Sequence, residues 1–309
     1  MSPAPTVTDP ALLAFADEVG ADDPVAIEGT RTRWEFGGVL ATGTRLVRAP
    51  SGIVEYRPEE MTVQVRAGTL VADLHAELAA AGQRTALPDR GGTVGGAIAV
   101  GEDDVCVLGV GRVRTAPLQV RYVSAEGKVI TGGGPTVKNV TGFDLPRLMT
   151  GSLGTLGLFA EVILRTNPVP AVTCWFVGAG VDPFAVRDAL FRPSAILADA
   201  ERTWIKLEGH APDVVSQARR LATFGDFEET DDPPPLPPHR WSLRRSQLRH
   251  LDLDRTGPHV LSVGTGTVFA ERPQSRLEPE PALRELAART KAAFDPTGRL
   301  NPGRKSALR

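Results

Sequence analysis

The sequence predicts an α+β protein of two domains. The chain has 309 residues, which leaves room for two domains of roughly 150 residues each. Residues 61–66, MTVQVR, alternate apolar and polar side chains as a half-buried strand does, whereas residues 70–81 repeat leucine and alanine at helical spacing. The run Asn167-Pro168-Val169-Pro170 then interrupts the regular secondary structure, and we expect the domain boundary there.

The first domain is predicted over residues 21–168, after an N-terminal tail over residues 1–20. Its helix takes Thr69 as the N-cap and ends at Gly82, since a hydroxyl before an apolar stripe and a glycine after it are typical helix boundaries. Glu126-Gly127 closes a hairpin. Short apolar or alternating segments predict the strands of this domain at 25–27, 45–48, 53–56, 61–66, 118–124, 128–131 and 158–165.

The second domain is predicted as a smaller α+β unit over residues 171–309. Residues 228–240, EETDDPPPLPPHR, are acidic and then rich in proline, which indicates a polyproline-like linker or exposed loop. A proline motif for a binding partner is the alternative for this segment. The same patterns predict strands at 172–177, 203–207 and 260–269 and helices near 183–191, 212–223 and 281–294.

The composition excludes several classes of protein. Lys and Arg number 35 and Asp and Glu number 37, so no strong overall field favours nucleic acid or an anionic membrane. The cysteines are Cys106 and Cys174, too few for a disulfide framework or for an iron–sulfur cluster of its own. No apolar run reaches the roughly 18–20 residues of a membrane span, and the N-terminus lacks the basic region of a signal peptide. We expect a cytoplasmic protein, and we predict no metal site.

Glycines gather in one part of the chain. Residues 91–157 hold 15 of the 32 glycines, in clusters between short apolar segments. Such clusters indicate loops laid against a ligand, or tight turns in the sheet. The motifs G-x-x-x-x-G-K-[ST] and G-x-G-x-x-G are both absent, so neither a P-loop nor a Rossmann nucleotide site is predicted.

Two motifs in the first half of the chain resemble a known family. Tyr56-Arg57-Pro58 is followed by VQVRAGT at 63–69, and the loop GTVGGA stands at 92–97. Together they resemble the vanillyl-alcohol oxidase/p-cresol methylhydroxylase (PCMH) family of flavoproteins, in which the second motif is a flavin loop.

Two later motifs resemble one branch of that family. KNVTGFDL at 138–145 is followed by GSLGTLG at 151–157 and by Glu161-Val162, and FDPTGRLNPG stands at 294–303. This order is similar to the branch that oxidises 2-hydroxy acids. Within that branch, the compact size of the chain and the sequence of residues 138–148 are similar to those of FAD-binding subunits of glycolate oxidases.

The resemblance implies a two-lobed PCMH-type FAD-binding domain followed by the smaller α+β domain. It implies noncovalent FAD, since no histidine or cysteine stands in an attachment motif. Backbone N–H groups of glycine-rich loops can form a nest around the pyrophosphate. The cofactor-binding residues implied are Gly29, Thr30, Arg31, Thr32, Pro88, Gly92, Thr93, Val94, Gly95, Gly96, Ala97, Val113, Arg114, Gly154, Thr155, Gly157 and Leu158.

The resemblance also implies partners and a reaction. The chain would hold FAD in a complex with a catalytic FAD subunit and an iron–sulfur subunit, and this complex would oxidise glycolate or a similar small 2-hydroxy acid to the 2-oxo acid. Electrons would leave through the iron–sulfur partner. The complex would lie in the cytoplasm, or at the inner face of the membrane through its partners.

No catalytic residue is assigned from the sequence. Oxidation of a hydroxy acid needs a base, but the histidines of the second half show no paired spacing and fit surface positions. The arginines at 240, 244, 245 and 249 fit one helix face, which would bind a carboxylate or a partner's acidic surface, or would be solvated. The histidines in question are His210, His239, His250 and His259.

Two alternatives stay open because the sequence departs from the family pattern. The loop EGTRTRWEFGG at 28–38 is poor in glycine, the segment 98–116 is altered, and Glu102-Asp103-Asp104 places acids near the expected pyrophosphate. These departures leave room for a scaffold subunit that has lost FAD. The other alternative is a self-sufficient FAD-dependent 2-hydroxy-acid dehydrogenase.

Overall fold

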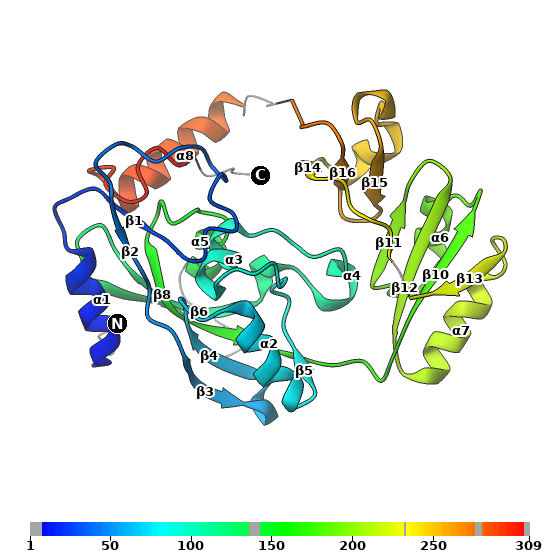
Figure 1. The fold of residues 1–309 in the computed structure, drawn as a ribbon, viewed down its shortest axis with the longest axis horizontal. Coiled ribbons are helices and arrows are strands. Elements are labelled where there is room, and N and C mark those ends of the chain that lie inside the picture. Colours follow the sequence, from blue (N-terminus) through cyan, green and yellow to red (C-terminus); the bar gives the residue numbers. More distant parts are fainter. Residues whose placement is uncertain (1–7, 136–142, 232, 276–279, 306–309) are drawn as a thin grey trace. The chain divides into compact units, whose positions relative to one another are not determined.

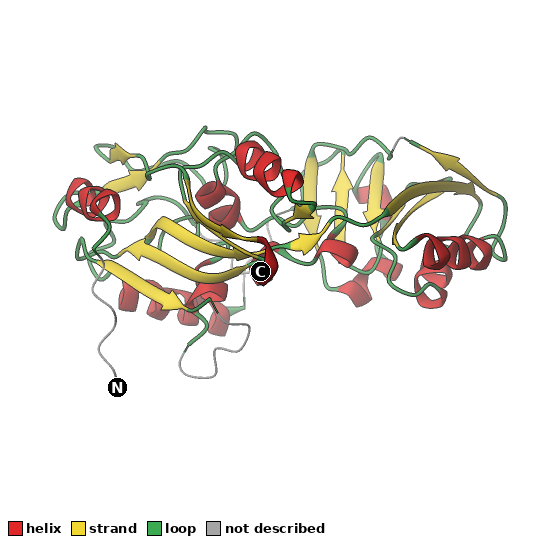
Figure 2. Ribbon diagram, turned by 90° about the horizontal axis from the view of Figure 1, so that it is seen from below, coloured by secondary structure: helices red, strands yellow, loops and turns green. Residues whose placement is uncertain are grey.

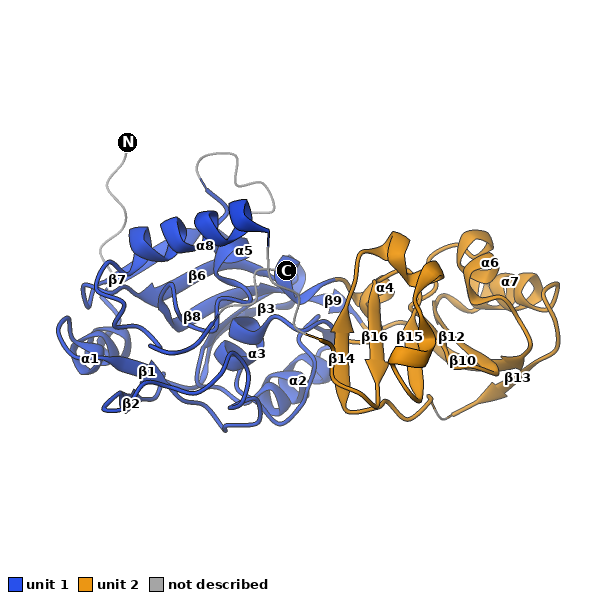
Figure 3. Ribbon diagram, turned by 90° about the horizontal axis from the view of Figure 1, so that it is seen from above, with its two compact units in different colours: residues 1–103, 112–168, 279–309 blue, residues 104–111, 169–278 orange. Residues whose placement is uncertain are grey.

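The structure, a computed structural model, describes residues 8–135, 143–231, 233–275 and 280–305. The chain forms two compact units, which Figure 3 colours separately. The described part of unit 1 lies within Met1–Asp103, Arg112–Pro168 and Pro279–Arg309, and that of unit 2 within Asp104–Gly111 and Val169–Glu278. The chain passes from unit 1 to unit 2 after Pro168, inside the run of prolines where the sequence predicts a boundary.

Unit 1 is built on a five-stranded antiparallel sheet (Figure 1). Its central strand, β8 (Leu158–Arg165), is buried over seven of its eight residues. The predicted hairpin at Glu126-Gly127 is present between β6 and β7. The strand order is β3 (Ile53–Arg57), β4 (Thr62–Arg66), β8, β6 (Pro117–Val123) and β7 (Val129–Gly133).

Helix α3 (Val94–Val100) contacts β4 and β8 of this sheet. Helix α2 is Val71–Ala80, close to the predicted range, but Thr69 is not its N-cap. Leu70 takes that position, and the Thr69 hydroxyl instead accepts a hydrogen bond from the Gly52 N–H at 2.8 Å. Three further short elements belong to unit 1: α5 (Leu145–Met149) and the paired strands β5 (Gln83–Arg84) and β9 (Asn167–Pro168).

A second layer of unit 1 joins the two ends of the chain. The parallel strands β1 (Val25–Ile27) and β2 (Arg45–Val47) share a core with helix α1 (Pro10–Val19) and with Leu300. The prediction of a tail over residues 1–20 is therefore wrong for residues 10–19, while residues 1–7 lie outside the described residues. The helix forms because Asp9 caps it and Leu12, Phe15, Ala16 and Val19 bury one face.

The C-terminal segment returns to unit 1, although the sequence assigned residues 171–309 to one C-terminal domain. Helix α8 (Pro281–Phe294) leads into residues that the first unit buries. Leu300 is fully buried and pairs with Val25, and the Arg299 guanidinium donates to the carbonyls of Val19, Asp23 and Ala125. A leucine in the core and an arginine with three carbonyl partners hold this segment in unit 1.

Unit 2 is a seven-stranded antiparallel sheet that shares a hydrophobic core with helices α6 (Pro183–Ala189) and α7 (Ala211–Leu221) (Figure 2). The short helix α4 (Val107–Val110) contacts β11. The predicted strand at 260–269 is a hairpin, because Gly264 and Gly266 take positive φ between its halves. The order is β13 (Phe227–Thr230), β10 (Val172–Ala179), β12 (Arg202–Gly209), β11 (Ala195–Ala198), β15 (His259–Ser262), β16 (Thr267–Ala270) and β14 (His239–Ser242).

The proline-rich segment connects the two outermost strands of this sheet. It runs from Thr230, the last residue of β13, to His239, the first of β14. Seven strands at ~4.8 Å spacing span ~29 Å, and nine residue steps of polyproline backbone at ~3.1 Å cover ~28 Å. An extended proline backbone therefore suits this crossing, which lies inside unit 2, and both ends of the 228–240 segment belong to strands.

Candidate functional site

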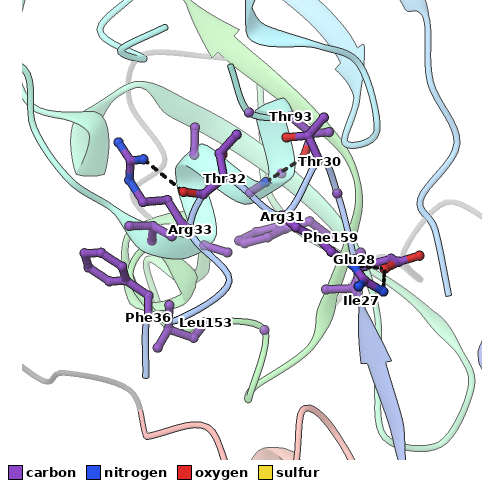
Figure 4. Close-up of a pocket in the computed structure, with 18 of the residues that line it drawn as sticks. Ile27, Glu28, Thr30, Arg31, Thr32, Arg33, Phe36, Thr93, Leu153 and Phe159 are labelled. Atoms are coloured by element: carbon purple, nitrogen blue, oxygen red, sulfur yellow. Dashed lines mark hydrogen bonds and ion pairs between the residues drawn. The ribbon is translucent and has the colours of Figure 1, made fainter. Parts of the chain in front are cut away.

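The candidate site is a pocket within unit 1, shown in Figure 4. The pocket and its open mouth together enclose about 1100 Å³ of empty space. Most of its lining comes from the loop after β1, the segment that leads into and forms α3, the turn before β8, and two residues near the C-terminus. Ala49, Ala67, Gly68 and Phe159 complete it. Residues from these parts, far apart in sequence, thus meet around one cavity.

The turn into α3 is held by its own backbone. The N–H groups of Val94 and Gly95 donate to the carbonyls of Thr69 and Ala67, each at 2.8 Å. The Gly96 N–H donates to the Thr93 hydroxyl, the N-cap of α3, and the Ala97 N–H donates to the Thr93 carbonyl. These four N–H groups of the loop at 92–97 are therefore already used within the protein.

The loop after β1 differs from this turn. Within the described residues, the backbone N–H groups of Gly29, Thr30, Arg31 and Thr32 make no hydrogen bond. The Thr30 hydroxyl donates to the Gly91 carbonyl at 2.8 Å, which joins the loop to the other wall of the pocket. A Cβ on Gly29 would lie 2.7 Å from the Thr93 hydroxyl oxygen, so this close approach requires glycine. Consecutive N–H groups without partners suit an anion.

Glu28 anchors the loop through ion pairs. Its carboxylate lies 2.6 Å from Arg31 and 3.0 Å from Arg48, and its side chain is 10% exposed. The hydrogen bond from Arg31 lowers the pKa of Glu28, with smaller contributions from Arg48. Arg31 itself has φ of 62°, a left-handed conformation that side chains rarely adopt. The ion pairs fix that conformation at the rim of the pocket.

The acids expected to repel a pyrophosphate all have hydrogen-bond or ion-pair partners within the protein. Glu102 lines the pocket, but its carboxylate lies 2.7 Å from Arg90 and 3.4 Å from Arg33. Asp103 accepts from Arg112 and from the Val113 N–H, and Asp104 accepts from the Cys106 N–H. The lining holds the arginines 31, 33, 90 and 304 against the glutamates 28 and 102, and this excess of positive charge favours an anionic ligand.

One residue of the lining holds a buried polar atom without a partner. Asn301 lines the pocket and is 4% exposed, and its Nδ2 has no hydrogen-bond partner in the described part of the chain. A Cβ on Gly154 would collide with this amide, and φ of Gly154 is 69°. A buried donor without a partner costs roughly 1–3 kcal/mol, so an acceptor atom of a bound ligand would stabilise the site.

The structure brings most of the implied site residues to the pocket. Six do not line it, and Val94, Val113 and Leu158 have fully buried side chains. Arg114 is in a short 3-10 turn, the Thr155 hydroxyl donates to the Ser152 carbonyl, and a Cβ on Gly157 would collide with Tyr122. The implied residues that do line it are Gly29, Thr30, Arg31, Thr32, Pro88, Gly92, Thr93, Gly95, Gly96, Ala97 and Gly154.

Sequence reasoning missed several lining residues. Asn301 stands inside the C-terminal motif and Arg304 just beyond it, so the motif could have pointed to both. Trp34 and Phe36 stand in the loop at 28–38, which the sequence singled out only for its shortage of glycine, and Arg90 carries no motif.

The candidate bases and the arginine run lie elsewhere. No histidine of the described residues lines the pocket. His210 precedes α7, His239 and His259 begin strands of unit 2, and the His259 ring hydrogen-bonds to Gly257 and Thr256. The four arginines do not form one helix face: Arg240 is in β14, whereas Arg245 and Arg249 are in a 3-10 helix at Arg245–His250.

Comparison with protein families identifies the domain that carries this pocket. Residues 11–133 match the model of the family described as FAD binding domain. The chain carries a PCMH-type FAD-binding domain. This FAD-binding domain includes the loop after β1 and the turn into α3. FAD fits the site, because the free N–H groups and arginines suit its pyrophosphate and Asn301 suits an acceptor atom elsewhere on it.

The relatives are FAD-dependent oxidoreductases of the glycolate oxidase and D-lactate dehydrogenase type. Glycolate oxidase subunit GlcE of Escherichia coli (strain K12) is 35% identical over 52% of this chain and 47% of its own length. A D-lactate dehydrogenase of Archaeoglobus fulgidus is 31% identical over 51% of this chain and 36% of its own. The chain thus matches about half or less of the length of these relatives.

A solved structure supports the fold around the FAD-binding domain. Alkyldihydroxyacetonephosphate synthase superposes on 96% of this chain and 75% of its own, with a TM-score of 0.69 and 13% identity. This likeness concerns the fold alone. Among the described residues, no helix has the length and apolar character needed to cross a bilayer.

Proposed function

We propose that the protein is the FAD-binding subunit of a glycolate oxidase-like complex that oxidises a 2-hydroxy acid to the 2-oxo acid. The observation that carries this proposal is the pocket of unit 1, with its unpaired N–H groups at residues 29–32. The similarity to glycolate oxidase subunit GlcE supports the choice of complex. The resemblance of the sequence to FAD-binding subunits of glycolate oxidases points the same way.

The residues of unit 1 have distinct roles in holding the cofactor. The N–H groups of Gly29–Thr32 bind the pyrophosphate, and the arginines of the lining neutralise it. Asn301 donates its amide N–H to an uncharged acceptor of the cofactor. Bound FAD supplies the acceptor for the two electrons that leave the hydroxy acid. Arg33 and Arg90 keep Glu102 paired, so this acid does not repel the phosphates.

We assign the substrate chemistry mainly to a partner chain. Alcohol oxidation needs a group that takes the hydroxyl proton, and the described lining of the pocket contains no histidine. The sequence has two cysteines, and a cluster is usually held by four ligands, so electrons leave through an iron–sulfur partner. The proposed complex works in the cytoplasm or at the inner face of the membrane.

Anaerobic flavin reduction tests the proposal. The chain is loaded with FAD and mixed with glycolate, D-lactate or L-lactate, alone and after assembly with its partner subunits, and the flavin absorbance is followed. We expect bleaching only in the assembled complex, and most strongly with one 2-hydroxy acid.

The other outcomes select the alternatives. Bleaching of the isolated chain by a hydroxy acid would make it a self-sufficient dehydrogenase. A chain that assembles with its partners but holds no flavin, alone or in the complex, would be a scaffold. Either result would overturn the proposed division of roles.

A further inference from the structure

The last turn of α8 carries a lysine that joins two parts of unit 1. The Lys291 ammonium donates to the Thr155 carbonyl at 2.7 Å and to the Leu300 carbonyl at 3.2 Å. It also donates to the Asp295 carboxylate at 2.5 Å. An ammonium has three N–H donors, so each of them has a partner here. Thr155 belongs to the turn before β8, whereas Leu300 lies near the C-terminus, so one side chain ties these distant segments together.

Asp295 holds the backbone that follows α8. Its side chain is fully buried, and its carboxylate accepts from the N–H groups of Arg299 at 3.1 Å and Leu300 at 2.8 Å. A buried carboxylate needs a cation and hydrogen-bond donors as partners, and Lys291 is that cation. The Lys291–Asp295 pair therefore holds Leu300 at both its N–H and its carbonyl.

The peptide bond that follows carries Asn301. Its two polar groups are both used, because the Leu300 carbonyl accepts from Lys291 and the Asn301 N–H donates to the Val25 carbonyl at 2.8 Å. The φ of Asn301 is 46°, a left-handed conformation that few residues other than glycine adopt. The pair at the end of α8 thus helps to fix the backbone from which the buried Asn301 side chain extends.

The turn before β8 packs against the same side chain. A Cβ on Gly154 would collide with the Asn301 Nδ2, and the next residue, Thr155, accepts from Lys291. Gly154 and Asn301 line the pocket, whereas Lys291 does not. Lys291 therefore holds both the residue with the unpartnered amide and the turn beside it, from a place behind the lining.

We infer that Lys291 is a positioning residue for the cofactor, which acts with Asp295 to place the Asn301 amide for FAD. This inference rests on the proposed function, in which that amide donates to FAD. The competing role is purely structural, in which Lys291 stabilises the C-terminal segment and affects FAD binding independently of Asn301. A residue that acts through Asn301 loses its effect on FAD affinity once the Asn301 side chain is removed.

A double-mutant cycle on FAD affinity separates the two roles. Fluorescence titration of the full-length chain, stripped of flavin, measures the dissociation constant of wild type, Lys291→Met, Asn301→Gly and the double variant. Glycine accommodates the left-handed backbone. We expect each single variant to bind FAD about 10-fold more weakly, the effect of one lost hydrogen bond. The double variant should also lose about 10-fold, and not about 100-fold.

Two further variants are the controls. Lys291→Arg keeps the cation and should recover most of the affinity. Arg289→Met should match wild type, because Arg289 is exposed on the same helix and makes no ion pair with the described residues. A loss of about 100-fold in the double variant, or wild-type affinity in Lys291→Met, would overturn the inference and leave the proposed function intact. A wild-type chain and complex that bind no FAD would overturn both.

Stability is measured beside affinity, because Lys291→Met leaves Asp295 buried without its cation. Urea unfolding of each flavin-free variant shows which of them are folded. If Lys291→Met is not folded, Lys291→Met/Asp295→Asn, which leaves no charge buried at this place, takes its position in the cycle with the same expected result.

Discussion

The loop after β1 and the turn into α3 face the same pocket but are stabilised in opposite ways. In the turn, the N–H groups of residues 94–97 all donate within the protein, and the backbone is complete without a ligand. In the loop, the N–H groups of residues 29–32 are unpaired, and the ion pairs of Glu28 hold the segment in place. The turn is thus complete without a ligand, whereas the loop leaves a row of N–H groups for one.

Gly96→Asp tests whether the turn lies near the bound ligand, and we expect it to have the largest effect, a loss of FAD affinity. Gly96 is exposed in the first turn of α3, and its new Cβ would lie 3.0 Å from the Thr93 hydroxyl, a side chain that can adjust. If the new carboxylate comes within ~5 Å of the pyrophosphate, the repulsion costs about 3 kcal/mol at an effective dielectric constant of roughly 20, or about 100-fold in FAD affinity. Fluorescence titration of FAD measures this loss.

Its control is the stability of the variant. An acid in the first turn of a helix is favourable, but the new Cβ crowds the Thr93 N-cap, so the variant should lose no more unfolding free energy than Thr93→Ala does. Full retention of FAD affinity by Gly96→Asp would show that the phosphates do not lie near the turn.

Gly95→Ala separates packing from ligand contact. A Cβ at this buried position would lie 2.8 Å from the Ala67 Cβ and 3.1 Å from the Ala67 carbonyl, so α3 would have to move away from β4. Such overpacking costs about 2 kcal/mol of unfolding free energy, which urea unfolding measures. Gly134→Ala is the control, because nothing lies within 4 Å of its added Cβ, and an equal loss in both variants would argue against the packing role.

Thr93→Ala tests the hydroxyl at which the loop and the turn meet. Its oxygen accepts from the Gly96 N–H at 3.2 Å and would lie 2.7 Å from a Cβ on Gly29. Loss of this N-cap should cost about 1 kcal/mol of unfolding free energy. Thr93→Ser keeps the hydroxyl and should recover most of it; if serine is no better than alanine, the cap contributes nothing measurable.

Glu28→Gln is expected to have the smallest effect and concerns the loop alone. Because the pKa of Glu28 is lowered in the folded state, its carboxylate stabilises the fold above a pH of roughly 4.5 and this contribution is lost as the pH falls through the folded value. Between roughly pH 6 and pH 3, wild type should lose under about 1 kcal/mol more unfolding free energy than Glu28→Gln. Identical losses in urea unfolding at the two pH values would remove Glu28 as the anchor of the loop.

The strands of both units follow from local patterns in the sequence. Residues 61–66 and 158–165 alternate or are continuously apolar, and they form β4 and β8. Helix α1 was missed although Leu12, Phe15 and Val19 share a helical face and Asp9 caps it. Thr69 shows a different limit of prediction from local sequence. Its hydroxyl accepts from the Gly52 N–H, and the neighbouring residues do not distinguish this contact from a helix cap.

The site follows from the sequence only in part. Glycine clusters and family motifs pointed to the walls of the pocket, but not to which N–H groups stay unpaired, because that depends on the partners Ala67 and Thr69 across the fold. Asn301 and Arg304 reach the pocket only because the chain returns from unit 2 and buries Leu300. The residues 138–142 of the third motif lie outside the described residues.

Hydrogen–deuterium exchange of the full chain, with and without FAD, tests most directly that the loop after β1 is the ligand-binding backbone. Peptides that cover residues 28–34 and residues 93–98 report the two segments. We predict that FAD slows exchange strongly in the loop, whereas the turn is already protected and changes little. Slower exchange in the turn with no change in the loop would contradict the assignment of Gly29–Thr32 to the pyrophosphate.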